Sequence, residues 1–139
     1  MRIEPIAAEA DVFLTEELDC TGAMSGEEVR ARVATYLASA AYPAGTALRL
    51  TLTGQVGLAC RPDPAVLARC GAALALFEVR DETLPIFDAG YLEKDPSLRG
   101  AFYRAMKPRL ESADPEIRAT AAAALRDGFA ALAGKEVSV

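Results

Sequence analysis

The chain of 139 residues contains no histidine and no tryptophan. Histidine is the commonest general base in enzymes and the commonest protein ligand of transition metals. Most catalytic triads built on serine or cysteine also need a histidine to activate the nucleophile. Catalysis by this chain would therefore have to come from carboxylates or lysine alone.

Cysteine is scarce, and the three cysteines are far apart in the sequence: Cys20, Cys60 and Cys70. Their number is odd and no CxxC pair occurs. The sequence therefore indicates neither a disulfide framework nor a zinc site. We predict reduced, buried thiols instead.

Long apolar runs are also missing. None approaches the roughly 20 residues needed to span a bilayer, and the first residues do not have the pattern of a signal peptide. We therefore expect a cytoplasmic protein. Phosphate-binding loops are not indicated either, because Gly54, Gly57 and Gly71 form neither a GxGxxG pattern nor a P-loop.

The chain is rich in apolar residues and has more acidic than basic residues. Apolar residues make up 52% of the chain, but with only five phenylalanines and four tyrosines the core has to be built from leucine, valine, isoleucine and alanine. The formal net charge of −5 gives the chain as a whole no attraction for a phosphate backbone. Local basic clusters could still contact nucleic acid if another domain supplied most of the binding free energy.

The clearest local pattern is the alternation over residues 48–54, where three leucines share one face and predict a half-buried strand. Residues 12–18 predict a second strand. Between them, Ser25 followed by Glu28 is a capping box that opens a helix, which Pro43 and Gly45 end. Strand, helix and strand together predict a β-α-β unit.

Aspartate followed by proline predicts three further helix starts, at Asp63, Asp95 and Asp114. Residues 73–80 predict another strand, apolar on both faces and therefore central or covered on both sides. Residues 81–85 are expected to leave the sheet. The last two helices should form a hairpin, with Pro108 kinking the first and Gly134 ending the second.

These patterns predict an α+β fold: a small mixed β-sheet with a β-α-β unit covered by helices, followed by a C-terminal helical hairpin. We expect a single domain over residues 1–139, because a chain of this length is typical of a domain with one hydrophobic core. Residues 1–90 would form the sheet part and residues 91–139 the hairpin.

Charged side chains gather in two places. Five acidic residues could supply oxygen ligands to a hard cation such as Mg²⁺, but their spacing matches no ion-binding loop and favours a solvated loop with a helix cap. Six basic residues are candidates for contact with DNA phosphates or an acidic partner, although the outer face of an amphipathic helix gives the same pattern. The acidic residues are Asp81, Glu82, Asp88, Glu93 and Asp95, and the basic ones are Arg49, Arg61, Arg99, Arg104, Lys107 and Arg109.

The predicted hairpin carries apolar residues at helical spacing on both helices. These stripes could pack against each other and the sheet, or partly against a helix of another protein, and the sequence leaves both open. The candidate residues for docking a partner are Phe102, Met106, Ile117, Leu125 and Phe129.

Four stretches resemble the C-terminal part of bacterial SbcD-type DNA repair exonucleases, in particular the YhaO-like branch of the metallophosphoesterase superfamily. They are the entry Arg2-Ile3-Glu4-Pro5-Ile6, the turn Leu18-Asp19-Cys20-Thr21-Gly22, the strand Arg49-Leu50-Thr51-Leu52-Thr53-Gly54, and Thr83-Leu84-Pro85 followed by residues 95–102 and an alanine-rich last helix. The resemblance covers most of the chain.

The resemblance implies an accessory or capping domain that lies beside the nuclease site and is part of a longer nuclease chain. In that family, aspartate, histidine and asparagine residues N-terminal to this region hold two metal ions, normally manganese. No catalytic or metal-binding residue carries over to this sequence. The implied partners are the phosphoesterase domain of the same protein, an SbcC-like ATPase and, indirectly, DNA. An independent protein-interaction or small-ligand-binding module is the alternative.

Overall fold

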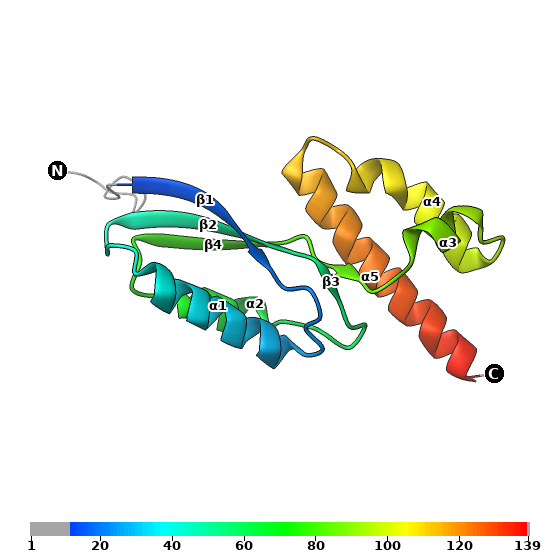
Figure 1. Ribbon diagram of the computed structural model, residues 1–139, viewed down its shortest axis with the longest axis horizontal. Coiled ribbons are helices and arrows are strands. Elements are labelled where there is room, and N and C mark those ends of the chain that lie inside the picture. Colours follow the sequence, from blue (N-terminus) through cyan, green and yellow to red (C-terminus); the bar gives the residue numbers. More distant parts are fainter. Residues whose placement is uncertain (1–11, 139) are drawn as a thin grey trace.

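The structure, a computed structural model, describes residues 12–138. Strands and helices alternate in the first part of the chain, and helices alone make up the last part (Figure 1). The elements are β1 Val12–Asp19, α1 Gly26–Ala40, β2 Thr46–Thr53, β3 Gln55–Val56, α2 Pro64–Cys70, β4 Leu76–Asp81, β5 Leu84–Pro85, α3 Ala89–Lys94, α4 Leu98–Leu110 and α5 Pro115–Ser138. The predicted α+β class with a C-terminal helical region is confirmed.

Three strands form the main sheet in the order β1-β2-β4. Every described pairing is parallel, with Leu14 opposite Leu48 and Leu48 opposite Phe77. We had expected a mixed sheet. The strands are parallel because α1 and α2 provide the crossovers, and both helices lie on the same side of the sheet (Figure 1).

The predicted capping box opens α1. The Ser25 hydroxyl accepts a hydrogen bond from the Glu28 N–H over 3.2 Å, and the Glu28 carboxylate accepts one from the Met24 N–H over 2.7 Å. The helix ends at Ala41, which has φ 52° in the left-handed region and donates its N–H to the Leu37 carbonyl. The chain is thus already turned before Pro43.

The main core lies between the sheet and α1. The three alternating leucines of β2, Leu48, Leu50 and Leu52, are at most 1% exposed and pack with Val29 and Val33 of α1. Burying each such side chain contributes on the order of 2 kcal/mol. The period-two pattern in the sequence therefore marks the strand at the centre of this core.

The strand predicted over residues 73–80 differs from β4 in two ways. It begins later, at Leu76, because residues 71–73 form a turn. Among residues 12–138 it also pairs only with β2 and so lies at the margin of the described sheet, where Leu76 is 44% exposed. The prediction of a central strand was wrong because apolar residues on both faces do not specify how many neighbours a strand has.

Several short elements were not predicted or were misplaced. Residues 84–85 leave the main sheet as predicted, but they form an unpredicted strand, β5, which pairs with β3 in a separate two-stranded sheet. The short helix α3 was not predicted. Asp95 is not the N-cap of α4 but the C-cap of α3. Ser97 is the N-cap of α4, and the Asp95 carboxylate accepts from the Ser97 N–H over 2.9 Å. The extended piece predicted for residues 2–6 lies outside the described residues.

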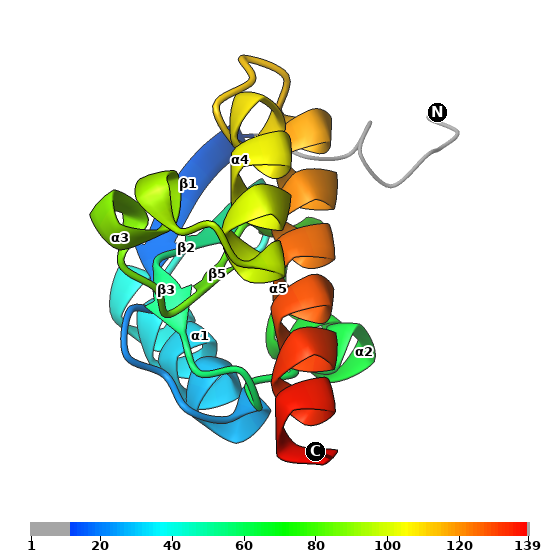
Figure 2. The same cartoon turned by 90° about the vertical axis from the view of Figure 1, so that its right-hand side faces the viewer.

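A second, smaller core joins the last three helices. It consists of Leu92, Tyr103, Leu125 and Phe129, with α4 lying along α5 (Figure 2). The predicted stripe on α4 is shifted, because Tyr103 is buried whereas Leu98 is 67% exposed. Pro108 lies inside the last turns of α4, and α5 continues past the predicted end at residue 134 to Ser138. The predicted hairpin is therefore present, with a first helix that begins later than predicted and a second helix that is longer.

None of the helices within residues 12–138 combines the length and the apolar character needed to cross a membrane.

Candidate functional site

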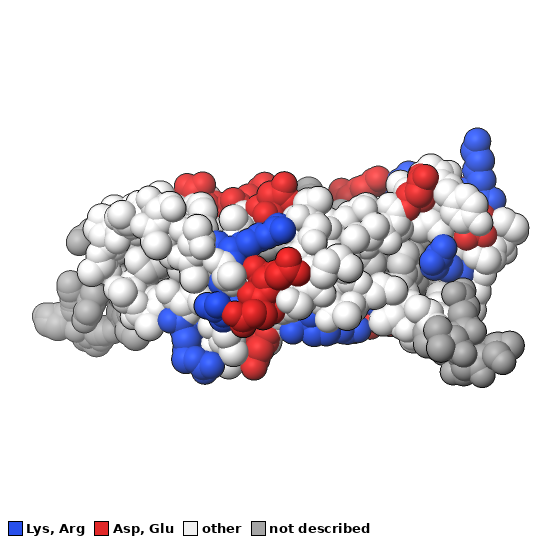
Figure 3. All heavy atoms as spheres, turned by 60° about the horizontal axis from the view of Figure 1, so that its bottom comes forward, with Lys and Arg blue, Asp and Glu red and all other residues white. Residues whose placement is uncertain are grey.

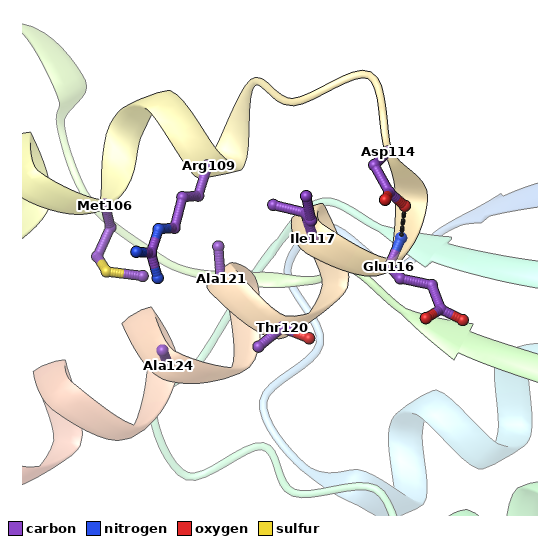
Figure 4. Close-up of a pocket in the computed structure, with 8 residues that line it drawn as sticks. All are labelled: Met106, Arg109, Asp114, Glu116, Ile117, Thr120, Ala121 and Ala124. Carbon is purple, nitrogen blue, oxygen red and sulfur yellow. Dashed lines mark hydrogen bonds between the residues drawn. The ribbon is translucent and has the colours of Figure 1, made fainter.

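A groove lies between α4 and α5 (Figure 4). Its volume is about 570 Å³. We call it the hairpin groove, and it is lined by Met106, Arg109, Asp114, Glu116, Ile117, Thr120, Ala121 and Ala124.

The floor of the hairpin groove is made by small residues of α5. Ala121 and Ala124 carry only a methyl group and therefore leave space above the helix backbone, whereas Met106 and Ile117 form apolar walls (Figure 4). Ile117 is 43% exposed, so its side chain is available for contact. An apolar surface of this shape accepts the ridge of another helix.

The hairpin groove has charged groups at its rim. Arg109 extends from the last turn of α4 toward α5, beside Met106 (Figure 4). At the start of α5, the Asp114 carboxylate accepts a hydrogen bond from the Glu116 N–H over 2.9 Å and so caps the helix. A ligand in the groove would meet an apolar floor, the cation of Arg109, and the carboxylates of Asp114 and Glu116.

Five of the six basic residues predicted as contacts have partners within the chain. Arg49 pairs with Glu78 at 2.5 Å, and Arg61 pairs with Asp127 at 2.6 Å. The remaining three, Lys107, Arg104 and Arg99, contact a carboxylate, a backbone carbonyl and an aromatic ring, respectively. Lys107 pairs with Glu93, Arg104 donates to the Asp95 carbonyl over 2.7 Å, and the Arg99 guanidinium lies 5.7 Å from the centre of the Phe129 ring.

These internal pairs have electrostatic consequences. A hydrogen bond from Lys107 to the Glu93 carboxylate, together with its negative charge, raises the pKa of Lys107. Exposed pairs of this kind are weak, so each cation could exchange its partner for a phosphate at modest cost. Of the six predicted residues, Arg109 is the one that lines the hairpin groove.

The five apolar residues predicted to dock a partner fall into two groups in the structure, one in the second core and one in the hairpin groove. Leu125 and Phe129 are at most 3% exposed and belong to the second core. Phe102 packs against this core too, with its ring centre 6.4 Å from that of Phe129. Met106 and Ile117 line the hairpin groove. Sequence spacing could not separate these groups, because it does not show how the two helices are rotated against each other.

The acidic residues form caps and ion pairs. Glu82 and Asp81 pair with arginines of α5, and Asp88 caps α3. Glu93 pairs with Lys107, and Asp95 binds Ser97. In the part of the chain that the structure describes, no group of three or more histidine, cysteine, aspartate or glutamate residues could hold a metal ion.

The face that carries α1 and α2 mixes both signs of charge. Figure 3 shows acidic and basic side chains interspersed there, with uncharged areas between them. A surface that tracks a phosphate backbone is instead a continuous basic stripe. This face does not have that arrangement.

Sequence reasoning missed five residues of the hairpin groove, among them Asp114 and Glu116, and two arginines that position α5. Thr120, Ala121 and Ala124 are small residues at helical spacing, a signal that was available in the sequence. Arg118 and Arg126 bind residues 36 and 43 positions earlier in the chain. No local pattern marks such long-range partners.

No protein-family model, curated protein or solved structure matches the chain. The fold and the hairpin groove therefore define it only as a small α+β domain with an open helical hairpin.

Proposed function

We propose that this chain is a non-catalytic accessory domain of a cytoplasmic SbcD/YhaO-like DNA repair exonuclease. In this role it packs beside the phosphoesterase domain of the same protein, helps to position DNA ends and docks an SbcC-like ATPase partner. The hairpin groove carries the proposal, because its apolar floor and exposed Ile117 are suited to a helix of a coiled coil.

Charge favours partner docking over direct contact with DNA. The net charge of −5 opposes binding to a phosphate backbone. Among the predicted basic residues, Arg49, Arg61 and Lys107 are paired with carboxylates. DNA would be engaged indirectly, through the other domain.

Two of the four stretches that carry the family resemblance end at a glycine with a special backbone requirement. In residues 18–22, the Asp19 carboxylate accepts from the Thr21 N–H over 2.9 Å, and Gly22 has φ 86°. Residues 49–54 end in Gly54, which has φ 102°. Resemblance at positions that the backbone constrains supports a shared fold more strongly than resemblance in a plain helix would.

The two manganese ions implied by the resemblance would belong to the phosphoesterase domain. The residues described here provide no group of ligands that fits such a pair of ions. We therefore assign no catalytic step to them. The purified chain supplied with Mn²⁺ is expected to cleave no DNA, and robust cleavage would contradict the proposal.

The docking role is tested by titrating the chain calorimetrically with a recombinant coiled-coil fragment of an SbcC-like ATPase. Ile117→Arg places a charge in the hairpin groove and is expected to weaken binding about tenfold or more. Leu98→Arg is the matched control, because Leu98 is exposed on α4 but does not line the groove. Equal binding by the wild type and Ile117→Arg would contradict docking at this site.

The alternative is an independent protein-interaction or small-ligand-binding module. The size of the hairpin groove favours a small ligand. The upstream DNA distinguishes the two. A reading frame encoding Asp-x-His, Gly-Asp and Gly-Asn-His motifs supports the exonuclease, whereas a promoter and ribosome-binding site directly before Met1 support the independent module.

A further inference from the structure

Strand β1 lies at one margin of the main sheet (Figure 1). Among residues 12–138 it pairs only with β2, in an uninterrupted register from Val12 opposite Thr46 to Asp19 opposite Thr53. It contains no proline and no bulge. Edge strands are usually protected by such features, because their unpaired backbone groups are a template for another strand.

The outward-facing backbone groups of β1 can be identified from its two ends. The Val12 N–H donates to the Gly45 carbonyl over 3.5 Å, and the Cys20 N–H donates to the Thr53 carbonyl over 2.8 Å. Residues of even number therefore face β2. Because the direction alternates along a strand, the backbone groups of the odd-numbered residues point away from the sheet. These residues are Phe13, Thr15, Glu17 and Asp19.

An apolar trough lies beside this edge on the α1 side of the sheet. It has a volume of about 460 Å³, and no residue of β2 lines it, so it lies on the outer flank of β1. A strand added next to β1 would direct every second side chain into it. The trough is lined by Leu18 of β1 and by Ala31, Arg32, Thr35, Tyr36 and Ser39 of α1.

Tyr36 gives the trough a fixed, uncharged wall. Its hydroxyl lies 2.6 Å from that of Tyr42, and the two rings pack with centres 6.2 Å apart. Burial, reinforced by this hydrogen bond, raises the pKa of Tyr36 and keeps the phenol neutral. The trough is therefore suited to apolar side chains.

The charges of β1 select the partner. Every charged side chain of the strand is acidic, namely Glu16, Glu17 and Asp19. A second copy of the chain pairing antiparallel at this edge would bring these carboxylates close to each other, which is destabilising. Leu14 and Leu18 face α1, so Glu17 and Asp19 lie on the opposite face of the strand. Lysine or arginine that alternates with the trough-filling residues of the added strand would face these carboxylates.

We propose that the outer edge of β1, which has no partner strand among residues 12–138, binds an extended segment of a partner protein by strand addition. In that segment, apolar residues that enter the trough alternate with lysine or arginine. Main-chain hydrogen bonds to β1 provide the affinity, and the trough and carboxylates provide the specificity. This inference does not depend on the nuclease resemblance or on the hairpin groove.

The test uses a labelled synthetic peptide, as long as β1, in which valine alternates with lysine. Thr15→Pro removes one outward N–H, and proline is tolerated at an edge position whose N–H faces solvent. We expect this variant to bind the peptide about tenfold more weakly than the wild type, as for the loss of one well-made hydrogen bond. Thr15→Ala is the matched control and should bind like the wild type.

Hydrogen exchange followed by NMR locates the bound peptide. Saturating peptide is expected to slow exchange of the Phe13, Thr15 and Glu17 amides. Absence of this protection, or equal affinity of Thr15→Pro and the wild type, would overturn strand addition. Equal binding of a peptide with glutamate in place of lysine would overturn the assignment of a basic partner.

Two further results would show that another occupant fills the edge. Slow exchange of the same amides in the peptide-free monomer would mean that the chain itself covers β1. Slow exchange that appears only at high protein concentration would mean that a second copy does. Either result would overturn the proposal, and neither bears on the nuclease resemblance.

Discussion

Arg126 on α5 binds Asp81 at the end of β4, with Nη2 3.3 Å from Oδ2. The same guanidinium donates to the carbonyl and the hydroxyl of Thr83. Asp81 in turn accepts from the Thr83 N–H and hydroxyl over 2.9 and 2.6 Å. This partly buried network, together with the pair between Arg118 and Glu82, joins the helical hairpin to the sheet.

Arg126→Ala is expected to lower the free energy of unfolding by about 2 kcal/mol, because Asp81 and the Thr83 carbonyl lose a partner in a site that water reaches poorly. Urea denaturation followed by circular dichroism measures the change. Arg109→Ala is the control and should change stability by less than about 0.5 kcal/mol, since Arg109 is exposed. Equal effects of the two substitutions would contradict the role of the network.

Gly54 and Gly22 form a matched pair for testing backbone and steric effects. Both have positive φ, 102° and 86°. A Cβ on Gly54 would lie 2.4 Å from the Thr21 hydroxyl oxygen, whereas one on Gly22 would meet nothing within 4 Å. Gly22→Ala should therefore destabilise by about 1 kcal/mol, from backbone strain alone.

Gly54→Ala adds the clash to the strain and should destabilise by about 3 kcal/mol. The difference between the two variants, measured in the same urea titrations, isolates the steric contribution. Similar losses in both would show that the turn at residues 19–22 moves to accommodate the new methyl group.

Asp95 should contribute to stability in a pH-dependent way. Hydrogen bonds from the Ser97 N–H and hydroxyl lower the pKa of Asp95 below its ordinary value of 3.8. The unfolded chain binds the proton more tightly, so the stabilisation is complete above pH 3.8 and is lost as the pH falls through the lowered folded pKa.

Asp95→Asn keeps an oxygen acceptor for Ser97 but removes the charge. Its stability should therefore fall less than that of the wild type as the pH is lowered from neutral to about 3, measured by urea midpoints. Parallel pH profiles for the two proteins would show that the charge of Asp95 does not contribute.

The three thiols should differ in reactivity. Burial raises the pKa of Cys20 to about 11, and burial also raises that of Cys60. Cys70 is only partly buried, and all three are free. A thiol-specific reagent at mildly alkaline pH should therefore modify Cys70 quickly, and Cys20 and Cys60 only as the protein unfolds.

Cys70→Ser is expected to remove the fast phase, and urea should accelerate only the slow phases. A fast phase that persists in Cys70→Ser would show that the main core opens more readily than its burial indicates.

Much of the fold could be predicted because its signals lie within short segments. Ser25 and Glu28 are three residues apart and form a cap that depends only on local backbone geometry. The leucines of β2 alternate because one face of the strand is covered. Asp63 caps α2 through a bond to a residue two positions on. Elements with such contiguous signals were placed within a few residues.

The candidate site was predicted less well. Met106 and Ile117 line the hairpin groove, whereas Leu125 and Phe129, which have the same helical spacing, are buried. Which side of each helix remains open depends on how α4 and α5 are rotated when they pack. That rotation is set by contacts such as Phe102 against Gly128, between residues far apart in the sequence.

By itself the sequence determined the class of fold, the main helices and strands and the free thiols, because caps, alternation and composition act over a few residues. Only the tertiary structure decided the order of strands, the pairing of β3 with β5, and which charges are paired within the chain. Those features depend on contacts such as Arg49 with Glu78 and Arg61 with Asp127, whose partners become neighbours only once the chain has folded.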